Sequence, residues 1–211
     1  MSPDMDPPTS PMPPRHTGSV QEPEMPAAPS PAPSPQAVSN SLVVPVLIGA
    51  AVAVALGVYG RLHEPTGFAV NLAGFSSTGY VKAWLATIAT LFGIVQLLSS
   101  LVMYGRLLAA APPWIDSLHR WSGRLAVLAS VPVAMHCLYA LGFQAYSARV
   151  LVHSLAGCLF YGAFTTKMLC LTRPNLPRGA LPVLGGLAFT GLVVLWLTSS
   201  LWLFSTKGLK F

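Results

Sequence analysis

Five long, uninterrupted apolar runs constrain the fold of this chain more than any other feature. They cover residues 42–60, 83–105, 118–141, 150–171 and 180–204. A helix that crosses about 30 Å of hydrocarbon needs about 20 apolar residues, which is the length of these runs. The runs are continuous rather than alternating, and in lipid each segment must satisfy its own backbone hydrogen bonds. The sequence therefore predicts an all-α polytopic membrane bundle of five transmembrane helices within residues 41–206.

Composition agrees with a membrane protein and argues against a soluble enzyme. Of the 211 residues, 53% are hydrophobic and 9% are charged, whereas about 25% are charged in an ordinary soluble domain. The net charge of +6 would suggest nucleic acid as a partner of a soluble protein. Here the basic residues flank the apolar runs, so we expect the lipid bilayer as a partner and no nucleic acid.

The two ends of the chain differ from the apolar runs. Residues 1–40 hold twelve of the 20 prolines together with four acidic residues, and they show no periodic apolar face. Such a segment cannot bury enough surface to offset its chain entropy, so we predict a disordered Pro-rich tail. Residues 207–211 form a short basic C-terminal tail.

The basic residues divide almost evenly between the two sides of a five-span protein. One set lies on the side of the N-terminal tail: Arg106, Arg120, Arg124, Lys167, Arg173 and Arg178. The other set lies opposite: Arg61, Lys82, Arg149, Lys207 and Lys210. The positive-inside rule favours a cytoplasmic N-terminal tail, although Arg61, directly after the first span, argues for the other orientation.

Histidines inside the spans are the strongest chemical signal, because ionisable groups are costly in a bilayer. His119 and His136 lie on the third span and His153 on the fourth. His136 and His153 are equally far from the centre of the link between these spans, so an antiparallel hairpin places them at the same depth. Two level histidines on two helices can supply both axial ligands of a haem b iron.

The neighbours of the two histidines suit a flat cofactor. Gly157 follows His153 by one turn and would leave room for a macrocycle, and Tyr161 lies near the same face. Pro132 can bend the third span at this depth. Because helices in direct contact are about 8–10 Å apart, the third and fourth spans would have to splay or lie diagonally to hold a porphyrin.

Two other interpretations of the histidines remain open. They can be packing residues of a non-catalytic accessory or scaffold protein, since histidines in packed spans often hydrogen-bond to neighbouring groups. They can also bind a metal ion, because His63 and Glu64 follow the first span on the side of His136 and His153.

The third span begins with a short His-Arg-x-x-Gly-Arg motif, residues 119–124. Its two arginines, Arg120 and Arg124, are four residues apart and share a helical face. They could hold a lipid phosphate, a haem propionate or an anionic partner. They could equally be basic flanks that reach the interface beside Trp121.

The stretch HRWSGRLAVLASVPVAMH from His119 to His136, followed by HSLAG from His153 to Gly157, carries a family resemblance. It resembles the transmembrane domains of ferric-reductase-like proteins and b-type cytochromes, where a His-Arg-x-x-Gly element begins a span that later carries a haem ligand. The resemblance implies His136 and His153 as ligands of haem b. The whole chain is also similar to an uncharacterised family of small bacterial multi-span proteins, which implies the bacterial cytoplasmic membrane.

The chain departs from the reductases in two respects. They typically stack two haems, whereas His119 lacks a second ligand to pair with. The chain also has no Gly-rich strand–turn–helix fingerprint of a flavin or nicotinamide domain, so we expect no self-contained catalytic domain. The leading hypothesis is a bis-His electron-transfer subunit that receives electrons from a membrane quinol or a redox partner protein.

Overall fold

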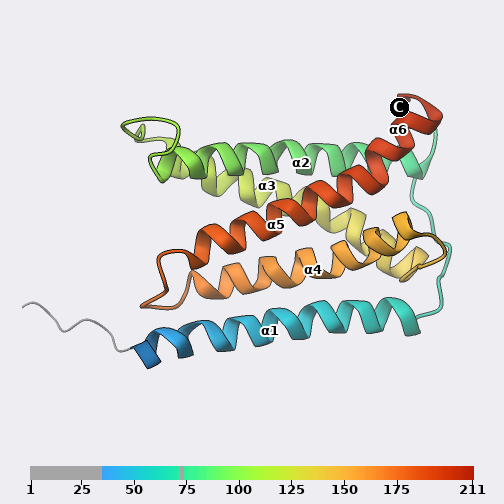
Figure 1. The fold of residues 1–211 in the computed structure, drawn as a ribbon. Helices are drawn as coiled ribbons and strands as arrows, with labels where there is room; N and C mark the ends of the chain where they lie inside the picture. Colours follow the sequence, from blue (N-terminus) through green and yellow to red (C-terminus); the bar gives the residue numbers. More distant parts are fainter. Residues whose placement is uncertain (1–34, 72–73) are drawn as a thin grey trace, which may run out of the picture. The chain divides into compact units, whose positions relative to one another are not determined.

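The described chain is entirely helical in its regular elements. A computed structural model gives the fold and describes residues 35–71 and 74–211, with side chains from residue 42 onward. The elements in chain order are α1 (Pro35–Leu62), α2 (Thr78–Met103), α3 (Ile115–His136), the π-helical turn η1 (Cys137–Leu141), α4 (Ala148–Cys170), α5 (Ala180–Trp196), the π-helical turn η2 (Leu197–Leu201) and α6 (Trp202–Lys207) (Figure 1). The tail predicted over residues 1–40 lies outside the described residues up to residue 34, and α1 already begins at Pro35.

The prediction of a five-span helical membrane protein is confirmed. Five helical segments are long and apolar enough to cross a membrane: Leu42–Leu62, Thr78–Met103, Ile115–Leu141, Ala148–Cys170 and Ala180–Lys207. The π-helical turn η1 completes the third span, while η2 and α6 complete the fifth. The second span begins at Thr78 rather than at residue 83, which places Lys82 inside a helix instead of in the preceding loop.

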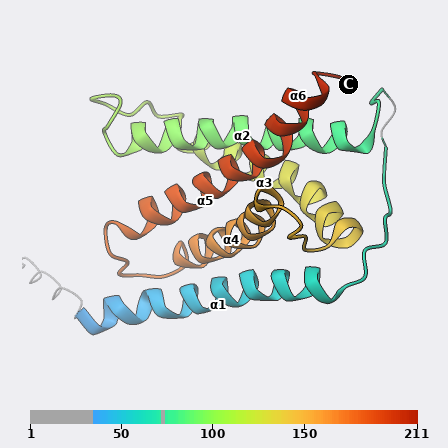
Figure 2. The ribbon, with the colours of Figure 1, turned by 45° about the vertical axis from the view of Figure 1, so that its right-hand side comes forward.

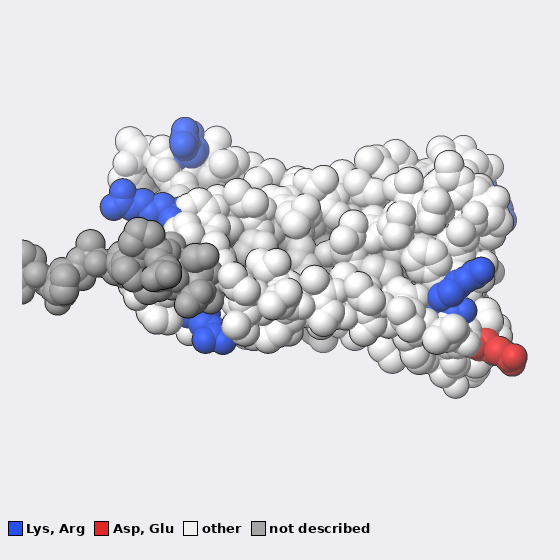
Figure 3. Space-filling view, turned by 60° about the horizontal axis from the view of Figure 1, so that its bottom comes forward, with Lys and Arg blue, Asp and Glu red and all other residues white. Residues whose placement is uncertain are grey.

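The outer surface of the bundle is apolar, as contact with lipid requires. Each span carries a large aliphatic side chain that is more than half exposed: Leu47 63%, Leu91 57%, Leu128 69%, Leu159 62% and Val183 68%. In water such a surface would drive association. Figure 3 shows basic side chains near both ends of the bundle and an acidic side chain near one of them, with an uncharged surface between the ends.

The order of helix packing differs from the order of the helices in the chain. The closely packed pairs are α1 with α4, α4 with α5, α5 with α2 and α2 with α3 (Figures 1 and 2). Although α3 and α4 follow one another in sequence, they are not such a pair. A hydrogen bond of 3.0 Å between Ser130 Oγ and Tyr161 Oη joins them near mid-span. The two helices therefore touch at this hydrogen bond without packing closely along their lengths.

Small residues allow α1 and α4 to approach closely. A Cβ atom added to Gly162 would lie 2.7 Å from the carbonyl oxygen of Gly49 and 2.9 Å from Ala53 Cβ. Backbones at this separation tolerate only glycine on the α4 side. Gly49 and Ala53 of the first span are thus part of a packing surface for α4.

The C-terminal residues fold back on the start of α2. Trp84 Nε1 donates a hydrogen bond of 2.9 Å to the carbonyl oxygen of Lys210, and the rings of Trp84 and Phe211 stack with centroids 4.8 Å apart. Tyr80 Oη donates to the carbonyl oxygens of Lys207 and Gly208, each at 3.1 Å. These contacts fix residues 207–211 beside the second span.

Candidate functional site

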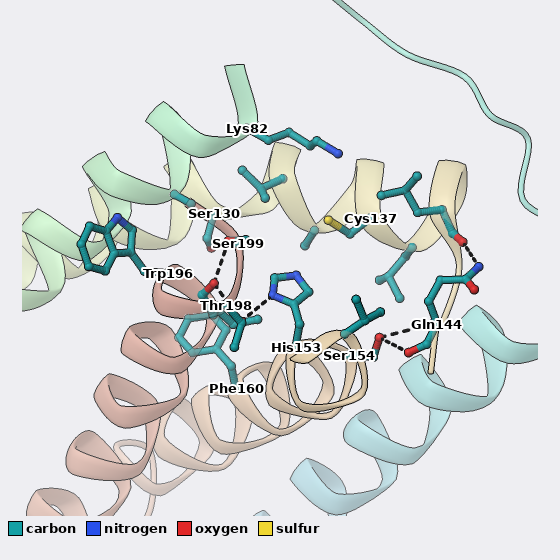
Figure 4. A pocket seen from close by; sticks show the side chains of 18 of the residues that line it. Lys82, Ser130, Cys137, Gln144, His153, Ser154, Phe160, Trp196, Thr198 and Ser199 are labelled. Carbon is teal, nitrogen blue, oxygen red and sulfur yellow. Dashed lines mark hydrogen bonds between the residues drawn. The ribbon is translucent and has the colours of Figure 1, made fainter. Parts of the chain in front are cut away.

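A cavity of about 670 Å³ lies within the bundle, in the half next to the α3–α4 loop. Most of its lining comes from the first halves of α2 and α4, the second halves of the third and fifth spans and the α3–α4 loop, and Leu56 of α1 also contributes (Figure 4). Small-molecule sites commonly occupy about 300–1,000 Å³ and are mostly apolar with a few polar groups, which describes this cavity. The parallel helices α2 and α4 and the two spans antiparallel to them thus line the same half of the bundle.

Both π-helical turns contribute to the cavity wall. Cys137 and Leu141 come from η1, while Thr198 and Ser199 come from η2. A π-helical turn widens the helix by one residue and frees backbone groups, and such turns are frequent at functional sites. Two spans thus have such a turn in the same half of the bundle, at the same cavity.

His153 is the polar group placed most centrally in the cavity. Its Nδ1 lies 2.9 Å from Thr198 Oγ1, whose single proton is donated to the carbonyl oxygen of Val194 at 2.7 Å. The hydroxyl must therefore accept the bond from Nδ1–H, which leaves Nε2 with a free lone pair. Figure 4 shows the ring extending from α4 into the cavity, so this nitrogen can accept a hydrogen bond or bind a metal.

The two other predicted residues of α4 also line the cavity. A Cβ atom on Gly157 would meet only Leu195 Cδ2, at 3.8 Å, so the glycine leaves open space on the cavity side. Tyr161 forms the inner wall, where its hydroxyl bonds to Ser130 and its ring meets the edge of Phe160 with centroids 5.0 Å apart. The Tyr161 hydroxyl thus joins α3 to α4 at the inner end of the cavity.

His136 lies outside the lining of the cavity that contains His153. The neighbouring Cys137 does line it, and successive residues of a helix are rotated by about 100°. His136 is half-buried on another face of α3. The predicted pairing of His136 with His153 depends on their equal depth, and depth does not determine how α3 is rotated about its axis. The structure therefore does not bring His136 and His153 to one cavity.

His119 belongs to a polar contact between α2 and α3 at the opposite end of the bundle. Its Nδ1 lies 2.9 Å from Ser99 Oγ, and its carbonyl oxygen accepts hydrogen bonds from Gln96 and Ser122. Gln96 Nε2 also lies 3.1 Å from Ser122 Oγ. All these polar groups are satisfied locally, so His119 holds the helix pair together.

The two arginines that follow His119 face outward. Arg120 and Arg124 are exposed, and the guanidinium carbon of Arg124 lies 5.1 Å from the ring centroid of the exposed Trp121. This arrangement matches basic side chains beside an aromatic residue at the membrane interface.

The structure does not support the metal-site alternative. His63 Nε2 donates a hydrogen bond of 3.2 Å to the carbonyl oxygen of Tyr139, and its ring stacks on those of Tyr59 and Tyr139 at 5.0 and 5.1 Å. Within residues 35–71 and 74–211, no three His, Cys, Asp or Glu side chains are grouped to hold a metal ion. His63 and Glu64 therefore do not complete a site with His136 and His153.

Sequence reasoning missed three residues of the cavity. Lys82 and Arg149, interpreted as basic flanks, both line it. Thr198, which fixes the His153 ring, comes from the fifth span. The run Thr198–Ser199–Ser200 is the polar interruption of that span and was the available signal.

The spans define an integral, multi-pass membrane protein of the all-α class, with a cavity inside the bundle. The chain belongs to the DUF6529 family, a family of unknown function, whose match covers residues 42–211. This confirms the expected membership of an uncharacterised family. No curated protein and no solved structure matches the chain.

Proposed function

We propose that the protein is a membrane electron-transfer subunit that binds haem b in the central cavity, with His153 as a ligand of the iron. The free Nε2 lone pair of His153 in an apolar cavity carries this proposal. Axial histidines are held in the same way, with the second ring nitrogen hydrogen-bonded so that the tautomer and ring orientation are fixed. Thr198 has that positioning role here.

The residues that line the cavity can supply one axial ligand of a haem iron. His153 supplies a neutral imidazole, Gly157 leaves space beside it, and the walls are mostly apolar. Haem would supply one-electron chemistry at this position, and burial in such walls is one of the factors that set its potential. The proposal assigns no iron-binding role to His136, because that residue does not line the cavity.

The proposal includes an external source of electrons, a membrane quinol or a redox partner protein. It places the protein in the bacterial cytoplasmic membrane with the N-terminal tail in the cytoplasm. Reporter fusions at residues 1 and 211 test this orientation, since five spans put the two ends on opposite sides. Reporters that are active on the same side would contradict it.

A reduced-minus-oxidised absorption spectrum of the purified protein tests haem binding. Cells are grown with adequate haem supply, and the protein is purified from membranes and reduced with dithionite. We expect Soret and α bands that His153→Ala abolishes and that His136→Ala retains. Absence of both bands from the wild-type protein would refute haem binding. Equal loss in both variants would indicate general damage to the fold and contradict the role of His153.

An accessory membrane protein whose cavity holds lipid is the second candidate. It is favoured by the position of His136, which leaves a single histidine at the cavity where the resemblance implies two. Such a protein would show no haem bands, and organic extraction followed by mass spectrometry would release a stoichiometric lipid. His153→Ala would then leave the amount of extracted lipid unchanged.

A further inference from the structure

The central cavity contains two cationic side chains that its apolar walls do not explain. Lys82, on the second turn of α2, and Arg149, the second residue of α4, both line it. The acidic residues of the described part of the chain are Glu64 and Asp116, and neither lines the cavity. The cavity therefore carries positive charge without a compensating carboxylate.

Arg149 is fixed in position, yet keeps free hydrogen-bonding capacity. One of its guanidinium nitrogens donates a hydrogen bond of 2.6 Å to the carbonyl oxygen of Thr198, and its guanidinium carbon lies 3.9 Å above the Trp202 ring. A guanidinium has five N–H donors, so most remain available. Lys82 makes no hydrogen bond or ion pair with another described residue, and Figure 4 shows its side chain above the cavity.

The polarity of the cavity changes along its length. Arg149 lies at the start of α4, His153 one turn further, and Phe160 about 16 Å from Arg149 at 1.5 Å per residue. Phe160 is buried, and with Ala89 and Leu192 it forms the apolar core cluster of the bundle. One end of the cavity therefore carries the cations, and the other is mostly apolar apart from hydroxyls such as that of Tyr161. This distribution is complementary to an anionic amphiphile.

We propose that this cavity selects an amphiphile with a carboxylate, which Lys82 and Arg149 bind while the apolar body extends toward Phe160. Both cations are half-buried, and a carboxylate would offset the cost of removing them from water through short, charge-assisted hydrogen bonds. An ester of the same molecule fills the same volume but cannot pair with them. This inference rests on the proposed function, because it concerns the same cavity. The two carboxylates of haem could pair with Lys82 and Arg149.

Fluorescence titration with acid and ester pairs tests the proposal without iron. The full-length protein, in a neutral detergent, is titrated with metal-free protoporphyrin IX and its dimethyl ester, and with dansyl-undecanoic acid and its methyl ester. We expect at least one acid to bind about tenfold more tightly than its ester. Lys82→Gln and Arg149→Gln should each remove most of this preference and leave the affinity for the ester unchanged.

Matched variants separate charge from damage to the fold. Lys210→Gln removes a cation on the same side of the bundle that does not line the cavity, so it should keep the preference for acids. Lys82→Arg retains the charge and should restore the preference lost in Lys82→Gln. An equal affinity of the wild-type protein for acid and ester in both pairs, no binding of any probe, or a preference that survives both glutamine variants would overturn the proposal.

The design also separates this proposal from haem binding. His153→Ala should abolish the haem bands and keep the preference for metal-free acids. A wild-type protein without haem bands that still prefers acids would refute the proposed function alone. A protein with haem bands and no preference in either pair would refute the carboxylate site alone.

Discussion

Gly157→Leu is the substitution that most directly tests whether haem lies beside His153. A Cβ atom at this position would meet only Leu195 Cδ2, at 3.8 Å, which is an ordinary van der Waals contact. Gly157→Ala should therefore be tolerated. The branched end of a leucine would extend beyond that atom into the cavity, where the macrocycle is proposed to lie.

The size of the effect follows from the cost of overpacking. Added methylene groups in a filled space cost about 1–3 kcal/mol. At about 1.4 kcal/mol for each factor of ten, this cost weakens haem binding by about 5- to 140-fold. The haem-free protein has open space at this position, so its stability should change by less than about 0.5 kcal/mol, as for a tolerated surface substitution.

Two measurements on three proteins test whether haem lies beside Gly157. Haem-free wild-type, Gly157→Ala and Gly157→Leu proteins are titrated with haem at the Soret maximum, and their thermal unfolding in detergent is compared without haem. We expect an affinity loss in the leucine variant alone and similar unfolding midpoints in all three proteins. A leucine variant that binds haem as tightly as the wild-type protein would show that the macrocycle lies elsewhere and would refute the reasoning.

Three further predictions concern helix packing and the positioning of His153. Gly162→Ala should lower the stability of the bundle in detergent by about 1–3 kcal/mol, because the added Cβ would lie 2.7 Å from the carbonyl oxygen of Gly49; an unchanged unfolding midpoint would contradict this contact. His119→Ala should cost about 0.5–1.5 kcal/mol of stability through the lost bond to Ser99 and leave the reduced haem bands intact, so that loss of the bands would contradict its structural role. Thr198→Val keeps the side-chain volume but removes the acceptor for His153 Nδ1, and haem affinity measured by titration should fall about 10- to 100-fold; an unaltered affinity would exclude Thr198 as the positioning residue.

The number and class of the spans could be predicted from the sequence, because in lipid both are local properties. A segment that satisfies its own backbone hydrogen bonds must be helical, and its apolar length decides whether it crosses the membrane. The depth of a residue follows in the same way from its distance to the end of its span. Residues spaced by four also share one face of a helix. This is why His153, Gly157 and Tyr161 were predicted at one site, and why they share one cavity wall.

The rotation of each helix and the choice of its neighbours depend on contacts between segments distant in the sequence. Cys137 rather than His136 lines the cavity, because packing of α3 against α2 sets the rotation of the third span. Thr198 meets His153 because α5 packs against α4, and no spacing in the sequence encodes that meeting. Lys82 belongs to the site because α2 begins at Thr78 and packs against α5. Burial in the membrane thus depends on the local sequence of each span, whereas the cavity depends on how several spans and the α3–α4 loop pack together.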